Sequence, residues 1–72
     1  MPVIALAWTS DRPDHRVEVH RQMPLQPAWR FVTTQSGTGY YDAPVERGVV
    51  ACYRVRYVDG TVWTPETCVL VP

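Results

Sequence analysis

Residues 49–63 read VVACYRVRYVDGTVW, and this stretch decides the fold. From Arg54 to Tyr57, charged and bulky residues alternate, which is the period-2 pattern of a strand with one buried face. Asp59-Gly60 follows at once, and Thr61-Val62-Trp63 resumes the strand pattern. An Asp-Gly pair between two such runs predicts a hairpin closed by a type I′ turn, because both central residues of that turn take positive φ.

Short β patterns recur along the rest of the chain, and no segment has a helical period. Seven prolines and four glycines separate the patterns at short intervals. Residues 23–27 are expected to form a loop, because two prolines cannot donate to a central ladder. Thr64-Pro65 is expected to kink or bulge the last strand. We expect six strands, at residues 4–8, 15–22, 29–34, 38–42, 49–58 and 61–71.

The length and the charge limit the class of protein. Seventy-two residues predict one small domain, residues 1–72, that buries about 60% of its unfolded surface. The formal net charge is zero and all seven cations are arginine, so no basic field favours nucleic acid or an anionic membrane as partner. The N-terminus lacks the pattern of a signal peptide, and no apolar run could span a bilayer. A soluble protein made in the cytoplasm is therefore expected.

In order along the chain, the motifs resemble those of a fibronectin type III domain, an immunoglobulin-like sandwich. The motifs are Leu6-Ala7-Trp8 for its B strand, His15 to Arg21 for C, Tyr40 to Asp42 with Val45 and Gly48 for E and the E–F corner, Tyr53 to Asp59 for F, and Trp63-Thr64-Pro65 for G. The resemblance implies an all-β fold, a small antiparallel two-sheet β-sandwich. Its expected core comprises Leu6, Trp8, Val17, Val19, Tyr53, Val55, Val69 and Val71.

Two departures from the family pattern matter. The tyrosine-corner position holds Ala51, so the corner hydrogen bond is expected to be missing or rebuilt by another residue. Strand A is absent or vestigial, which makes the uncharged strand at residues 4–8 a sheet edge. Such an edge invites pairing with another chain. We therefore expect residues 1–8 to be covered in an assembly.

Two surfaces are candidates for protein contacts. The first is the edge strand, with Ile4, Ala5 and Ala7. The second is the outer face of the larger sheet, where arginine and tryptophan suit an interface hot spot but could equally form a cation–π ladder that solvates the sheet. Its candidate residues are Arg16, Glu18, His20, Arg54, Arg56 and Trp63.

Cys52 and Cys68 are a candidate pair. Counted from the Asp59-Gly60 turn, position 52 faces 67, and one bulged residue near Pro65 brings 68 opposite 52. Because the resemblance places Val69 and Val71 inward, both cysteines are expected on the outer face. They could form a cross-strand disulfide or a thiol pair, or be two unrelated reduced cysteines, as the cytoplasm favours.

No pattern of catalytic residues is visible. Two cysteines do not supply the four ligands of a structural zinc site, and the odd spacing of the two histidines sends them to opposite faces of a strand. We expect no enzyme, no cofactor and no metal site. The residues able to do chemistry are His15, His20, Asp42, Glu46, Cys52 and Cys68.

Three functions fit a neutral sandwich of this kind. The first is a structural subunit of a larger assembly, a small phage virion protein of the decoration or connector type. Its partners would be proteins, including further copies of itself, and the chain from Met1 would be a complete unit. The second is a free-standing binding protein that inhibits a host protein. The third is an adhesive or carbohydrate-linked module, which would need export.

Overall fold

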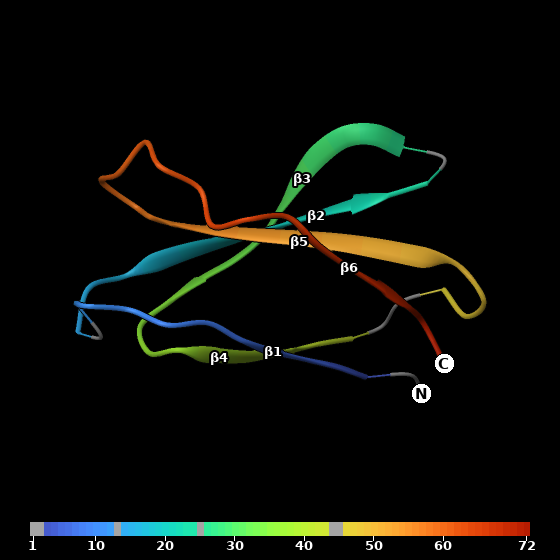
Figure 1. The fold of residues 1–72 in the computed structure, drawn as a ribbon, viewed down its shortest axis with the longest axis horizontal. Helices are drawn as coiled ribbons and strands as arrows, with labels where there is room; N and C mark the ends of the chain where they lie inside the picture. The colour runs from blue at the N-terminus through green and yellow to red at the C-terminus, as the bar shows by residue number, and fades with distance from the viewer. Residues whose placement is uncertain (1–2, 13, 25, 44–45) are drawn as a thin grey trace.

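The predicted all-β, two-sheet sandwich is confirmed in a computed structural model, which describes residues 3–12, 14–24, 26–43 and 46–72. One layer is an antiparallel pair of β1 (Ile4–Ala7) and β4 (Gly39–Asp42). The other is an antiparallel sheet with the order β3-β2-β5-β6 (Figure 1). Its strands are β2 (Val17–Met23), β3 (Gln26–Gln35), β5 (Val50–Tyr57) and β6 (Thr67–Leu70). Met1 and Pro2 of the segment expected to be covered, and Val45 of the expected corner, lie outside the described residues.

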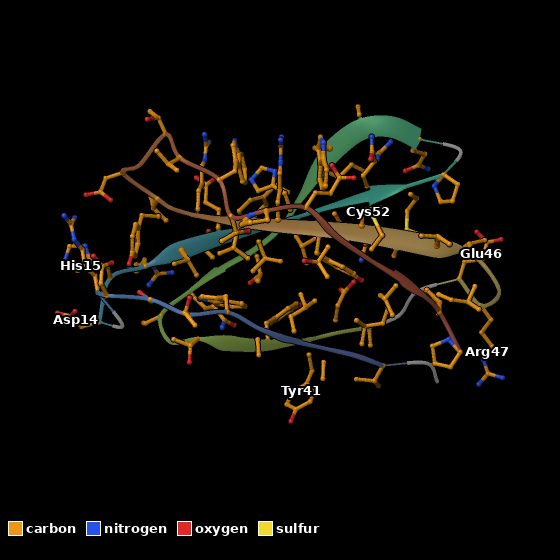
Figure 2. All side chains as sticks on the ribbon, in the orientation of Figure 1. Asp14, His15, Tyr41, Glu46, Arg47 and Cys52 are labelled. Atoms are coloured by element: carbon orange, nitrogen blue, oxygen red, sulfur yellow. A yellow bond between two sulfur atoms is a disulfide. The ribbon has the colours of Figure 1, made fainter. Side chains whose placement is uncertain are left out.

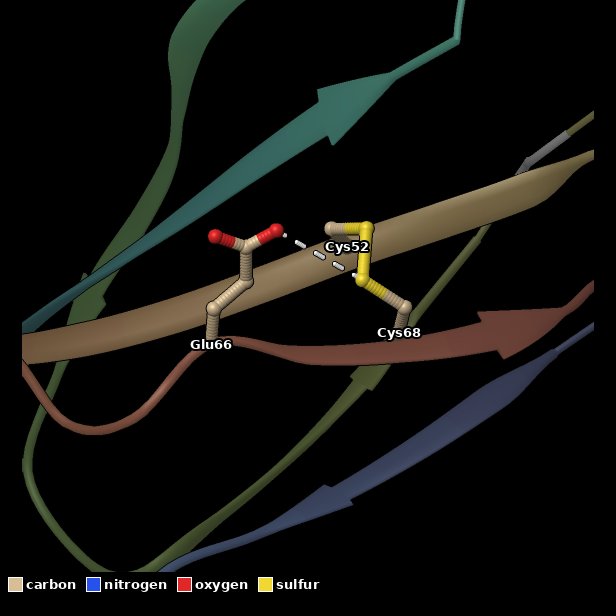
Figure 3. Close-up of side chains that lie close together, drawn as sticks. All are labelled: Cys52, Glu66 and Cys68. Atoms are coloured by element: carbon tan, nitrogen blue, oxygen red, sulfur yellow. Dashed lines mark hydrogen bonds between the residues drawn. A yellow bond between two sulfur atoms is a disulfide. The ribbon is translucent and has the colours of Figure 1, made fainter.

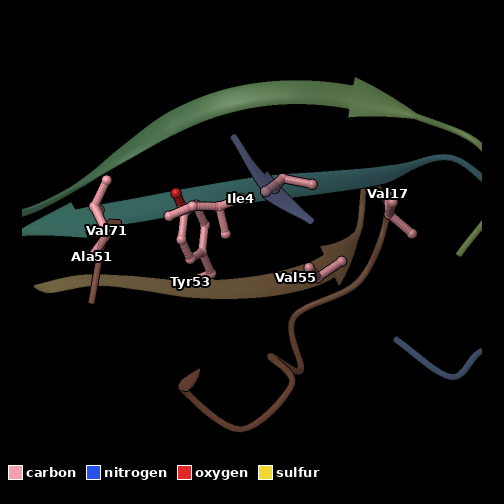
Figure 4. Close-up of a cluster of buried hydrophobic side chains, with 7 residues drawn as sticks. Ile4, Val17, Ala51, Tyr53, Val55 and Val71 are labelled. Atoms are coloured by element: carbon pink, nitrogen blue, oxygen red, sulfur yellow. The ribbon is translucent and has the colours of Figure 1, made fainter. Parts of the chain in front are cut away.

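Alternate residues of the strands fill the space between the layers (Figure 4). The buried apolar residues are Ile4, Val17, Val19, Ala51, Tyr53, Val55 and Val71. Leu6 and Trp8 pack against them while half-buried. Five of the eight predicted core residues are thus buried, and two more line the core.

Val69 is the exception to the predicted core. It pairs with buried Ala51 but is 37% exposed. Its strand, β6, lies at the edge of the four-stranded sheet, and a two-stranded layer is too narrow to cover four strands. Ile4, predicted as an interface residue, is only 6% exposed and belongs to the core instead.

The loop predicted at residues 23–27 does not extend to Pro27, and Leu25 of that loop lies outside the described residues. β3 already begins at Gln26 and contains Pro27, and Met23 pairs with Gln26. The argument from proline holds for central strands, but β3 is an edge strand. A proline is tolerated there, because its missing N–H costs no ladder bond on the solvent side.

The last hairpin differs from the prediction. The Gly60 N–H donates to the Tyr57 carbonyl at 2.9 Å, so Val58 and Asp59 are the central residues of the turn. Among the described residues only Gly37 and Gly48 have positive φ, so the predicted type I′ turn at Asp59-Gly60 is wrong. The sixth strand starts at Thr67 rather than 61.

The bulge predicted near Pro65 is confirmed. The Thr64 N–H donates to the Val55 carbonyl at 2.8 Å, and the next pairs are Thr67 with Tyr53 and Cys68 with Cys52. Between these two pairs the chain advances three residues from Thr64 to Thr67, but only two residues from Val55 to Tyr53 on the opposite strand. The extra residue in one strand is the definition of a bulge.

A second bulge fixes Val71 at the other end of this strand pair. The Gly48 N–H donates to the Val71 carbonyl at 3.0 Å, and the Val71 N–H donates to the Val49 carbonyl at 2.8 Å. Val71 thus faces both Gly48 and Val49, which is a bulge, and Gly48 has a φ of +78°. Glycine takes this left-handed conformation without the steric cost that a Cβ brings.

The two glycines therefore predict different responses to substitution. Gly48→Ala should lower the free energy of unfolding by about 1–2 kcal/mol, because its Cβ is strained at positive φ. Gly60→Ala has no strain from positive φ, but its Cβ would lie 3.3 Å from the Tyr57 Cβ and 3.4 Å from the Tyr57 carbonyl oxygen. This tight contact should cost less than the strain at Gly48. Thermal unfolding midpoints of both variants test this. Equal losses would contradict the observed turn.

Candidate functional site

The outer face of the four-stranded sheet carries a stack of arginine and tryptophan side chains, here called the Arg–Trp ladder. Arg54 lies between two indoles, with its guanidinium carbon 4.3 Å from the Trp29 ring centre and 4.0 Å from that of Trp63. Arg56 continues the stack at 4.5 Å from Trp63. These are cation–π distances. The predicted residues Arg54, Arg56 and Trp63 are thus in contact, and the sequence did not reveal that Trp29 joins them.

Glu18 and His20 of β2 lie beside the ladder. They are the register partners of Arg56 and Arg54 on β5. A Glu18 carboxylate oxygen accepts from Arg56 Nε at 3.1 Å and lies 2.9 Å from His20 Nε2. The hydrogen bond with His20, and then the one with Arg56, lower the pKa of Glu18 below its usual value. His20 also meets Trp63 edge to face at 4.7 Å.

The structure therefore brings together five of the six candidates for this face. Arg16 lies apart and reaches the Thr34 carbonyl at 3.5 Å. Phe31 contacts His20 at 5.8 Å between ring centres and remains 59% exposed. The contacts within the ladder favour a role in covering the sheet, while exposed Phe31 is the part of this face free to meet a partner.

A buried ionic cluster joins the two layers. The carboxylate of Asp42, a residue 2% exposed, accepts from Arg21 at 2.7 Å and from the Tyr53 hydroxyl at 2.5 Å. Asp42 ends β4, whereas Arg21 and Tyr53 come from β2 and β5. The sequence marked Asp42 only as a residue able to do chemistry. Its position between the sheets makes it a structural anchor, because a buried carboxylate needs such partners.

The pKa values of this cluster follow from its burial. Burial, and then the hydrogen bond and charge of Asp42, raise the pKa of Tyr53 well above its usual value. For Arg21, burial works against the charged form, but the hydrogen bond and charge of Asp42 outweigh it and raise the pKa. The Tyr53 phenol is therefore held in its neutral, donating form.

This shift predicts a loss of stability in alkali. The folded state keeps the Tyr53 proton more tightly than the unfolded chain, so its contribution is complete below about pH 10 and declines above it. Urea unfolding between neutral pH and about pH 11 should show this decline. Tyr53→Phe should cost about 1–3 kcal/mol at neutral pH and remove much of the alkaline decline. A decline unchanged in this variant would contradict the assignment.

A second tyrosine holds the segment that follows β1. The Tyr57 hydroxyl donates to Asp11 at 2.8 Å and lies 2.6 Å from the Ser10 hydroxyl. This hydrogen bond lowers the pKa of Asp11 below its usual value. The Tyr57 ring meets His15 edge to face at 5.9 Å. These contacts fasten the end of β1 to the end of β5 without making a closed site.

Cys52 and Cys68 are joined by a disulfide across β5 and β6 (Figure 3). The Val71–Val49 bond makes that pair a hydrogen-bonded one, so by alternation the cysteine pair is non-hydrogen-bonded. Side chains lie closest in pairs of that type. Cys52 alternates with buried Ala51 and Tyr53, which places the bridge on the outer face as predicted.

Glu66 lies beside this bridge. Its carboxylate oxygen is 3.6 Å from Cys68 Sγ, the approach marked by the dashed line in Figure 3. An oxidised sulfur has no proton to donate, so this is a contact and not a hydrogen bond. The ligand atoms of Cys52, Glu66 and Cys68 lie within 4.8 Å of one another. A metal requires thiolates, and the disulfide withholds both sulfurs.

Reduction of the bridge should destabilise the protein by about 3 kcal/mol, because the bridge closes a loop of 16 residues in the unfolded chain. Thermal unfolding with and without a phosphine reductant measures this loss, with thiol titration to verify reduction. The double variant Cys52→Ala, Cys68→Ala is the control and should not respond to the reductant. An unchanged midpoint after verified reduction would contradict the expectation.

The remaining residues able to do chemistry are dispersed. His15 and Glu46 lie at opposite ends of the molecule (Figure 2). Asp42 is between the layers and His20 on the outer face. Within the described part of the chain, the only group of three potential metal ligands is the one at the disulfide.

The free edge of β1 borders a groove. The Trp8 N–H donates to the Thr38 carbonyl, so Trp8 and Thr38 form a hydrogen-bonded pair. Because such pairs alternate along an antiparallel ladder, Leu6 and Ile4 are also hydrogen-bonded to β4. The N–H and C=O groups of Ala5 and Ala7 therefore point away from β4. Within the described ranges, no strand pairs with this side of β1.

The groove beside this edge, here called the β1 groove, has a volume of about 370 Å³. It runs between β1 and the start of β6 and is lined by Leu6, Trp8, Val55 and Pro65, among others. A second hollow of about 540 Å³ continues from it toward Val62, which is 82% exposed. The buried indole N–H of Trp8 has no hydrogen-bond acceptor among the described residues.

Comparison of the chain with protein-family models, with curated proteins and with solved structures finds no match. Among the described residues, no helix is long and apolar enough to cross a membrane.

Proposed function

We propose that this chain is a non-enzymatic structural subunit of a larger assembly, a small phage virion protein of the decoration or connector type that acts through protein contacts. The observation that carries the proposal is the free edge of β1. The outward backbone groups of Ala5 and Ala7 lie beside the β1 groove, and no residue of β1 carries a charge. Proteins that stay single protect such edges with charge, proline or cover.

The fibronectin type III-like character belongs to the same proposal. The strand order β3-β2-β5-β6 with β1-β4 is compatible with a sandwich of that kind in which no described strand occupies the first-strand position beside β1. A strand from another protein would then take the vacant position. The virion setting itself is an analogy with small sandwiches on phage particles.

The Arg–Trp ladder supports a second candidate, a free-standing binding protein or inhibitor of a host protein. Arginine and tryptophan dominate binding hot spots, and Phe31 is 59% exposed at their margin. The ladder residues already stack on one another, although the buried Nε of Arg54 has no hydrogen-bond partner among the described residues. At the β1 edge, whole backbone N–H and C=O groups have no described partner. The edge therefore gives the stronger support.

Sedimentation of lysate from the cells that make the protein tests the choice. An antibody against the chain should find it in fast-sedimenting particles. Ala5→Lys with Ala7→Lys should release it to the top of the gradient, because charge then occupies the edge. Tyr41→Lys is the control, since Tyr41 is 75% exposed on neighbouring β4 and points away from the sandwich (Figure 2). A wild-type chain found only as a small species, alone or with one host protein, would overturn the assembly proposal.

A further inference from the structure

We propose that the occupant of the β1 edge is a second copy of this chain, paired antiparallel through β1 about a two-fold axis. This rests on the proposed function and names the first partner in the assembly. The two β1–β4 layers would become one continuous four-stranded sheet with the order β4-β1-β1-β4.

The backbone of β1 is complementary to itself. Its outward groups belong to Ala5 and Ala7, two residues apart. With Leu6 on the two-fold axis, Ala5 faces Ala7 of the second copy and Ala7 faces Ala5. Both pairs are then hydrogen-bonded pairs that exchange both N–H···O=C bonds. The geometry of an isologous contact, in which each patch meets its own copy, is satisfied.

The side chains also permit this approach. Ala5 and Ala7 are small, exposed and on the outer face, so they do not obstruct a second backbone. β1 contains no charged residue, and the formal net charge of the chain is zero, so two copies do not repel each other. An edge designed to remain free would carry a lysine or an inward-pointing charge here.

The pairing would also cover apolar surface that one copy leaves open. A two-fold axis perpendicular to the sheet keeps the inner faces of both copies on the same side. Leu6 of the second copy would lie beside Leu6 at the mouth of the β1 groove. Leu6 and Trp8 are only half-buried in the single chain, and both line that groove. The second copy would cover the parts of the Leu6 and Trp8 side chains that are exposed in the single chain.

Sedimentation equilibrium of the purified chain over a wide concentration range tests the dimer. We expect the mass to approach twice 8.2 kDa as concentration rises. Ala7→Pro removes one outward N–H from each copy without touching the β1–β4 bonds, and proline is tolerated at an open edge. It should raise the dissociation constant by about tenfold or more. Ala7→Val, which keeps the N–H, should dimerise like the wild type.

Amide hydrogen exchange of the wild-type chain gives a second readout that needs no variant to fold. The amides of Ala5 and Ala7 should become protected as concentration rises, whereas the Leu6 amide, bonded to β4, should not change. A chain that is a monomer throughout overturns the inference. A dimer in which these two amides exchange freely also overturns it. If a monomeric chain is nevertheless found in particles, the proposed function stands and the edge is occupied by another protein.

Discussion

The carboxylate of Asp42 is bonded to Arg21 and Tyr53, and this contact connects the two-stranded layer to the four-stranded one. The buried side chains that surround this contact are apolar, and their packing is nondirectional. Breaking a buried charge pair from one side costs several kcal/mol, because the other charge is left without a partner. The cluster therefore sets which strands face each other, while the valines around it supply the hydrophobic free energy.

The outer face of the four-stranded sheet and the free edge of β1 differ in how far their polar groups are paired. On the outer face of the large sheet, the Arg–Trp ladder connects β3, β5 and the segment before β6 that contains Trp63. The disulfide connects β5 to β6. At the β1 edge, backbone groups point outward beside the β1 groove. A small domain buries little surface, so an uncovered edge is a large share of what it exposes. This contrast is the reason for proposing β1 as the site of assembly.

Most strands could be located from the alternation of residues, because one buried face imposes a period of two. The register at the cysteines was also predictable, since a single bulge at Pro65 follows from the missing N–H of proline. The turn at Asp59-Gly60 was not, although Asp-Gly is the strongest local signal. The Trp63 side chain packs on Arg54 and Arg56 on the outer face. Residues 61–63 therefore do not continue as a strand directly after the turn, and β6 begins only at Thr67.

By itself, the sequence determined the all-β class and the inward valines of β2 and β5, and it made Cys52 and Cys68 a candidate pair whose disulfide the structure shows. These depend on periodicity and on counting along two neighbouring strands. Only the tertiary structure decided that Asp42 is buried, that Trp29 completes the ladder, and that Val69 lies exposed on an edge. These depend on which residues of distant strands meet across layers or on a shared face. No local pattern encodes such meetings, because they follow from the packing of the whole chain.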